Sequence, residues 1–176
     1  MTKIFETADI LKIQDEYRTS KKFDGLKTMI KCIKDNQRVS WSYLYAHKDD
    51  LEGIYLDGDY LGVTLQDFSN ANFKNSFLAE VRFDTAQLTN ANFNGSTFWD
   101  VSFADATLDG ADFRGAHILY AYRQIEAFFD PVSCKGLLLK DTTFESYNQS
   151  SSDSISDSYE IEKIKKMLKE NGAIFS

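Results

Sequence analysis

Large apolar residues recur at every fifth position between residues 61 and 120. When this segment is divided into groups of five, the first position is mostly small and the other three are mostly polar or glycine. A period of five matches neither the 3.6-residue period of a helix nor the two-residue period of a strand, so it predicts a repeat architecture. All twelve central positions are large and apolar: Val63, Phe68, Phe73, Leu78, Phe83, Leu88, Phe93, Phe98, Phe103, Leu108, Phe113 and Ile118.

A chain that turns a corner after each group of five explains this pattern. Four such edges close one square coil, and the first and third positions of every edge then point toward the axis. Successive coils stack about 4.8 Å apart through backbone hydrogen bonds, as in other solenoids. Residues twenty apart should therefore lie above one another, and we expect Phe73, Phe93 and Phe113 to form one buried column.

Four of the groups resemble the pentapeptide-repeat family. They read ANFKN, ANFNG, ATLDG and ADFRG, and the family pattern is a small residue, Asp or Asn, Leu or Phe, then two polar or small residues. The resemblance covers about residues 61–120. It implies a mainly β fold, a right-handed quadrilateral β-helix with about three regular coils.

The segments around the repeats predict the remaining organisation. We expect residues 51–145 to form the solenoid, with an irregular first coil and an insertion at 121–136. The first coil is irregular because Leu51 and Leu56 are five apart but two positions out of register with the repeats. After the insertion, Leu139 and Phe144 are again five apart, which predicts a partial extra coil.

Both ends of the chain carry amphipathic, helical patterns. Residues 1–50 predict a helical N-terminal cap, in which residues 23–34 place apolar side chains at helical spacing with lysines opposite. Residues 146–158 are rich in serine and predict a linker. Residues 159–176 predict a C-terminal amphipathic helix, which either docks on its own chain or pairs with a second copy in a homodimer, because a lone short helix is marginal in water.

Charge and composition narrow the class of protein. The 176 residues include 27 acidic and 20 basic residues, a formal net charge of −7, which disfavours direct binding to nucleic acid or to anionic membranes. No run approaches eighteen consecutive apolar residues, and residues 1–18 lack the pattern of a secretory signal. We therefore expect a cytoplasmic protein.

Catalytic motifs are scarce. The two histidines, His47 and His117, lack the spaced Cys, His or carboxylate partners of a zinc site. The chain has no glycine-rich phosphate loop and no nucleophile elbow. We expect no enzyme, no catalytic residue, no metal and no cofactor.

Two surfaces are candidates for binding a partner protein. The outward positions of one solenoid face predict an aromatic surface, covered by the chain itself or by a partner: Phe77, Trp99, His117, Leu119 and Tyr120. The acidic side chains of the repeats predict a second, negative surface: Asp67, Asp84, Asp100, Asp105, Asp109 and Asp112.

These surfaces favour a non-catalytic module that binds a partner and inhibits or shields it, the partner being a nucleic-acid-processing or defence enzyme. The alternative follows from the family resemblance. Several pentapeptide-repeat proteins are thought to imitate DNA and so protect type II topoisomerases from quinolones or toxins, and regularly spaced carboxylates would stand for phosphates.

Overall fold

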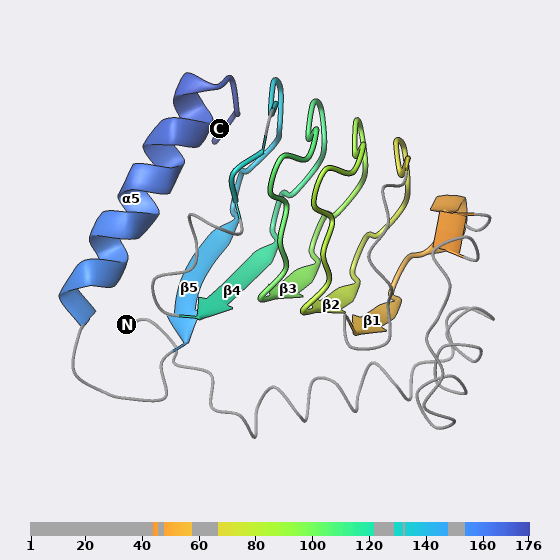
Figure 1. Ribbon diagram of the computed structural model, residues 1–176, viewed down its shortest axis with the longest axis horizontal. Coiled ribbons are helices and arrows are strands. Elements are labelled where there is room, and N and C mark those ends of the chain that lie inside the picture. Colours follow the sequence, from red (N-terminus) through yellow and green to blue (C-terminus); the bar gives the residue numbers. More distant parts are fainter. Residues whose placement is uncertain (1–43, 46–47, 58–66, 122–128, 132, 148–153) are drawn as a thin grey trace.

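A computed structural model describes residues 44–45, 48–57, 67–121, 129–131, 133–147 and 154–176. These residues form a stack of coils with a helix at one end (Figure 1). The elements in chain order are the 3₁₀ turn η1 (Lys48–Asp50), the strands β1 (Tyr55–Asp57), β2 (Phe77–Ala79), β3 (Thr97–Trp99), β4 (His117–Ala121) and β5 (Thr143–Tyr147), and the helix α5 (Ser154–Glu170).

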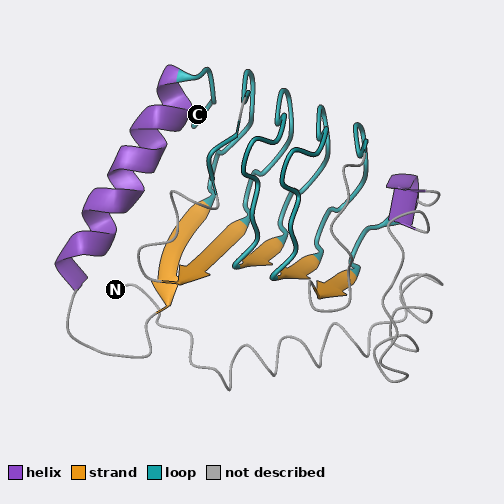
Figure 2. Cartoon of the chain, in the orientation of Figure 1, coloured by secondary structure: helices purple, strands orange, loops and turns teal. Residues whose placement is uncertain are grey.

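The five strands form one parallel sheet in the order β1-β2-β3-β4-β5, so sequence neighbours are also spatial neighbours (Figure 2). The other edges of each coil are joined by single parallel bridges, such as Asn72 with Asn92 and Asn92 with Asp112. Both kinds of pair are twenty residues apart in the regular part of the repeat. The predicted stacking of residues twenty apart is confirmed.

The third positions form the core of the solenoid. Phe73, Phe93 and Phe113 are fully buried. The ring centroid of Phe93 lies 5.1 Å from that of Phe73 and 4.8 Å from that of Phe113. Phe83 and Phe103 stack in the same way, 5.6 Å apart. The predicted aromatic column is therefore present, and a second one runs beside it.

Local hydrogen bonds explain the residue types at the other positions. The side chains of Asn72, Asn92 and Asp112, at second positions, each accept a hydrogen bond from the backbone N–H two residues later. This side-chain turn is typical of Asn and Asp. Every fifth position from residue 70 to residue 115 has a φ between 50° and 67°, a conformation that Asn and Gly adopt most easily.

The first coil is irregular in the way that the sequence predicts. Leu56 pairs with Leu78, and the N–H of Leu51 donates to the carbonyl of Asn72. The strand pairing is offset by 22 residues instead of twenty, which accounts for the two-residue shift in register.

The predicted insertion at 121–136 is too long. Thr107 bridges Ser133 and Ile118 pairs with Phe144, an offset of 26, so six residues are added to the repeat of twenty. The five-residue period resumes at Phe129, whose ring lies 5.4 Å from that of Phe103 in the core. Phe129, Cys134, Leu139 and Phe144 then supply one buried side chain per edge.

The C-terminal helix packs on the last coil of its own chain. Ile164 and Leu168 are buried in the same core cluster as the phenylalanines, and α5 lies beyond β5 (Figure 1). Docking within the chain is therefore the alternative that the structure shows. The predicted linker is shorter than 146–158, because β5 extends to Tyr147 and α5 already begins at Ser154.

The residues after α5 add one more edge to the solenoid. Ile174 bridges Leu138 in parallel, and the N–H groups of Leu139 and Ile174 donate to the carbonyls of Ile174 and Leu137. Ala173 is buried and Phe175 packs on the core, as the first and third positions of a repeat would. The chain end thus satisfies backbone groups that a solenoid end would otherwise expose.

The predicted N-terminal cap lies mostly outside the described residues, which begin at Leu44. Leu44 is fully buried in the core cluster. The ring of Tyr45 contacts that of Phe68, with centroids 6.4 Å apart. These two residues cover the first-coil end of the aromatic core.

Candidate protein-binding surfaces

The outward side chains of β2–β5 form what we call the outer sheet face. Side chains alternate along a strand, and Leu78, Phe98 and Ile118 belong to the core. Their neighbours therefore point away from the core: Phe77, Ala79, Thr97, Trp99, His117, Leu119, Thr143 and Glu145.

Tyr120 does not belong to the outer sheet face, and its predicted place there is wrong. It lies two residues after Ile118 in β4, so alternation turns it inward. Its side chain is only 2% exposed and is part of the core cluster. The five-residue period alone predicts an outward position, but β4 continues as a strand through residue 121 and the corner comes later.

Phe77 and Leu119 are on the outer sheet face, but neither is available to a partner. Phe77 is 0% exposed, and Ala79 and Leu119 are each 1% exposed, although none of the three belongs to the core cluster. These exposures are those of the single chain. The predicted aromatic surface is therefore covered within the chain, which was the first of the two alternatives.

The remaining outward side chains form a partly exposed margin. Trp99 and His117 are half-buried. A ring nitrogen of His117, Nδ1, is hydrogen-bonded to Oγ1 of Thr143 at 2.8 Å. One carboxylate oxygen of Glu145 is buried and has no hydrogen-bond partner.

Three of the predicted acidic residues come together on the solenoid face that follows the outer sheet face. The N–H of Glu80 donates to the carbonyl of Trp99, so Glu80 and Asp100 stack at one corner. In the same way, the N–H of Thr85 donates to the carbonyl of Ala104, and the N–H of Asp105 donates to the carbonyl of Asp130. These bonds place Asp84, Ala104 and Asp130 in one column. We call the resulting surface the acidic edge: Glu80, Asp84, Asp100, Asp105 and Asp130.

The described stretches that form the acidic edge contain one cation. Arg82 is the one basic residue among residues 80–85, 100–105 and 129–131, and it lies 3.6 Å from Asp84. Asp84 also accepts a hydrogen bond from the hydroxyl of Ser102. Glu80, Asp105 and Asp130 are exposed. Sequence reasoning missed Asp130, because the predicted insertion hid the resumption of the repeat at Phe129.

The other three predicted acidic residues lie apart from this edge and hold local structure. Asp67 accepts a hydrogen bond from the N–H of Ser69, and the hydrogen bonds that the Ser69 side chain and backbone donate lower the pKa of Asp67. Asp109 accepts from the hydroxyl of Ser133 at 2.5 Å and from the N–H of Lys135 at 2.8 Å. These carboxylates are therefore committed to turns and to stacking between coils.

Asp112 is paired with a cation. The guanidinium of Arg114 donates to both of its carboxylate oxygens, at 2.9 Å from Nε and 2.7 Å from Nη2. The hydrogen bond from the Arg114 side chain is the main reason why the pKa of Asp112 lies below its ordinary value. Asp112 adds little net negative charge to its face.

The corners next to the acidic edge carry unusual residues for their backbone conformation. Glu80 and Thr85 have φ values of 53° and 62°, whereas the corners of the opposite faces in the regular repeats are all Asn or Gly. A side chain other than Gly costs about 1–2 kcal/mol in this conformation, least for Asn and Asp. Strain of this kind is often retained at functional surfaces.

A comparison with models of known families identifies the repeat from which the coils are built. The model of the family "Pentapeptide repeats" matches residues 67–98 and 83–118, with eight copies of the repeat. Residues 67–118 therefore consist of pentapeptide repeats. Pentapeptide repeats imply a β-helix, in agreement with the coils and the parallel sheet. The comparison with curated proteins gives no match.

Two further observations concern the described part of the chain. Its described residues contain no group of three or more His, Cys, Asp or Glu side chains that could hold a metal ion. None of its described helices is both long and apolar enough to cross a membrane.

Proposed function

We propose that this pentapeptide-repeat protein is a non-catalytic, cytoplasmic binding module that docks its acidic edge on a basic surface of a partner protein and thereby inhibits or shields that partner. The observation that carries the proposal is the gathering of five carboxylates from three separate stretches of sequence on one side of the solenoid. Within the described residues of these three stretches, Arg82 is the one basic residue. Such a surface speeds association with a positively charged partner and selects against negatively charged ones.

Two properties of the scaffold support this assignment. The carboxylates lie on coils that are fixed by backbone hydrogen bonds and by stacked phenylalanines, so little conformational entropy is lost on binding. Two strained corners are also found here, at Glu80 in the acidic edge and at Thr85 next to it. A nucleic-acid-processing or defence enzyme is a suitable class of partner, because its nucleic-acid site presents a basic surface.

Neutralising part of the acidic edge tests the proposal. We expect Asp105→Asn with Asp130→Asn to weaken the complex about fivefold at low salt, at about 0.5 kcal/mol per carboxylate. The matched control is Asp67→Asn with Asp141→Asn, which removes the same charge from exposed residues elsewhere. The partner is identified by co-purification with the wild-type chain, and affinities are then measured with purified proteins at two salt concentrations.

Equal weakening by both pairs would show that net charge, and not the acidic edge, controls binding. An affinity that does not fall with added salt would also contradict an electrostatic interface.

DNA imitation is the narrower candidate, and the stacked pair of carboxylates on neighbouring coils favours it. Coil spacing is about 4.8 Å, so Glu80 and Asp100 place two carboxylates on adjacent coils along the solenoid axis. A supercoiling assay with a type II topoisomerase tests this candidate. Protection from a quinolone by the wild type and by the control pair, with loss of protection in the acidic-edge pair, would support it.

A further inference from the structure

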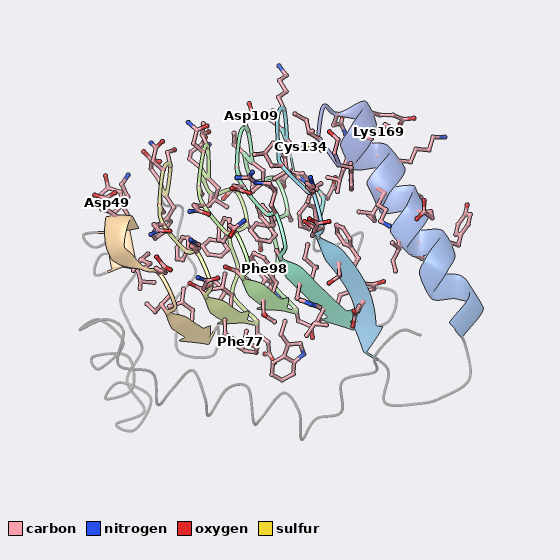
Figure 3. All side chains as sticks on the ribbon, turned by 180° about the vertical axis from the view of Figure 1, so that it is seen from behind. Asp49, Phe77, Phe98, Asp109, Cys134 and Lys169 are labelled. Atoms are coloured by element: carbon pink, nitrogen blue, oxygen red, sulfur yellow. The ribbon has the colours of Figure 1, made fainter. Side chains whose placement is uncertain are left out.

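The outer side of helix α5 is a surface that the proposed function does not use. The inner side docks on the last coil, where Ile164 and Leu168 are buried and the sulfur of Cys134 lies 3.8 Å from the carbonyl oxygen of Leu168. Figure 3 shows Cys134 on the coil beside the helix and Lys169 on the helix. Among the described elements α5 is the outermost at its end of the stack (Figure 1), so its other side faces away from the coils.

One stripe of exposed side chains runs along this outer side. Its members are three or four positions apart, and 3.6 residues per turn place them on the side of α5 opposite Ile164. Tyr159 is 68% exposed, and the side chains of Glu162 and Lys166 are 74% and 78% exposed in the single chain. Lys169 is also exposed. We call these four residues the helix stripe: Tyr159, Glu162, Lys166 and Lys169.

The helix stripe is complementary to itself when its direction is reversed. Its first half holds an aromatic ring and a carboxylate, and its second half holds two ammonium groups. Glu162 and Lys166 are equally far from Ile164 in sequence, and so are Tyr159 and Lys169. An antiparallel second helix centred on Ile164 therefore places its Lys166 opposite Glu162 and its Lys169 opposite Tyr159. Two-fold symmetry makes each of these contacts twice.

Both kinds of contact are attractive. A carboxylate facing an ammonium group forms an ion pair between the two chains. An ammonium group over the face of a tyrosine ring forms a cation–π contact. This chain already contains such a contact, since Nζ of Lys48 lies 5.1 Å from the ring centroid of Tyr45.

The interactions within α5 do not replace these contacts. Glu162 lies 3.3 Å from Lys165, and Lys166 lies 3.9 Å from Glu170. Exposed ion pairs within one helix are weak, so each charge still responds to a second copy. The helix dipole favours carboxylates near the start and lysines near the end on every side of a helix. It does not account for the exposed ring of Tyr159 on the same stripe.

We propose that α5 pairs with α5 of a second copy of this chain, antiparallel and two-fold symmetric, through the helix stripe. The 17 residues of α5 span about 25 Å, so one helix pair lies at the small end of specific interfaces. We expect a reversible dimer with a dissociation constant of about 0.1 mM that salt weakens further. The dimer presents two acidic edges, but the pairing itself does not rest on the proposed function.

Reversing one charge of the helix stripe tests the pairing in the full-length chain. Sedimentation equilibrium at low salt gives the dissociation constant of the wild-type dimer. We expect Lys166→Glu and Glu162→Lys each to weaken the dimer about tenfold, because like charges then face each other at both symmetric contacts. The matched control is Lys74→Glu, which makes the same change in net charge as Lys166→Glu. Lys74 is partly exposed near the first coil, so this variant should leave the constant unchanged.

An equimolar mixture of the two stripe variants separates loss of pairing from damage to α5. In a mixed dimer the two carboxylates of one chain face the two ammonium groups of the other. We therefore expect Lys166→Glu and Glu162→Lys chains to form a heterodimer at least as tight as the wild-type dimer. A mixture that stays monomeric while each variant keeps its wild-type circular dichroism would overturn the proposal.

The aromatic contact has its own pair of variants. Tyr159→Ala removes the ring from both cation–π contacts and should weaken the dimer about fivefold, whereas Tyr159→Phe keeps the ring and should retain the dimer. Equal constants for these two variants would reject the contact with Lys169. A wild type that stays monomeric up to about 1 mM would reject the dimer itself. Equal weakening by Lys166→Glu and Lys74→Glu would show that net charge, and not the helix stripe, controls association.

Discussion

Replacing Phe93 tests the packing of the solenoid most directly. Phe93 is fully buried in the middle of the repeat. Its ring centroid lies between 4.8 Å and 6.1 Å from those of other phenylalanines on its own coil and on the coils before and after it, namely Phe73, Phe83, Phe98, Phe103 and Phe113. Phe93→Ala therefore removes the shared neighbour of five rings.

The expected loss follows from the inability of the site to collapse. Replacing a buried Phe with Ala costs about 3–5 kcal/mol, and the cost rises with the size of the remaining cavity. Backbone hydrogen bonds from Phe93 to Asp112 and from Asn92 to Ala71 fix the spacing of the neighbouring coils, so the coils cannot move together to fill the cavity. We therefore expect a loss near the upper end, about 4–5 kcal/mol, which is a large part of the roughly 5–15 kcal/mol that stabilises a typical domain.

Phe93→Leu provides the matched control. Leucine already occupies the same repeat position at Leu78, Leu88 and Leu108, so it fits the backbone and leaves a smaller cavity. We expect this variant to lose about 1–2 kcal/mol.

Urea unfolding followed by circular dichroism gives both values, provided that the dependence on urea concentration is the same as in the wild type. A loss below about 2 kcal/mol for Phe93→Ala, or equal losses for the two variants, would refute the argument that the columns are closely packed.

Three further predictions concern individual positions. Thr85→Asn should raise the free energy of unfolding by about 1 kcal/mol, because Asn tolerates the positive φ of this corner better than a β-branched residue; a lower urea midpoint would contradict this. Ser96→Ala should lower the free energy of unfolding by about 1 kcal/mol, since the buried hydroxyl of Ser96 donates to the carbonyl of Phe73 at 2.6 Å. An unchanged thermal midpoint would show that this bond adds nothing to stability. The lowered pKa of Asp112 means that its pairing with Arg114 stabilises the fold above the unfolded pKa and is lost as the pH falls through the folded one. Asp112→Asn should therefore reduce the difference in stability between pH 7 and pH 3, measured by urea midpoints, and an unaltered difference would reject the pairing.

The sequence predicts the repeated part of the fold well because each position has a local reason. A large side chain at every fifth residue specifies the core, Asn or Asp at second positions closes a turn with the N–H two residues later, and Asn or Gly suits the corner. Even the irregular first coil can be predicted, since the shift of Leu56 against Leu78 is visible as two extra residues.

The candidate sites are less predictable because they depend on where the period stops. Tyr120 turns inward because β4 continues past the expected corner, and Phe129 re-enters the core after six added residues. Asp130 joins the acidic edge for the same reason. Neither the length of a strand nor the length of an insertion follows from a five-residue pattern.

The sequence alone thus determined the coil, its twenty-residue stacking and its aromatic core, because these depend on contacts that repeat at fixed intervals. Only the tertiary structure decided which carboxylates share one edge, that the outer sheet face is covered within the chain, and that α5 and Ile174 close the last coil. These features join residues far apart in sequence, and their contacts depend on how the irregular segments bring the chain back to the solenoid.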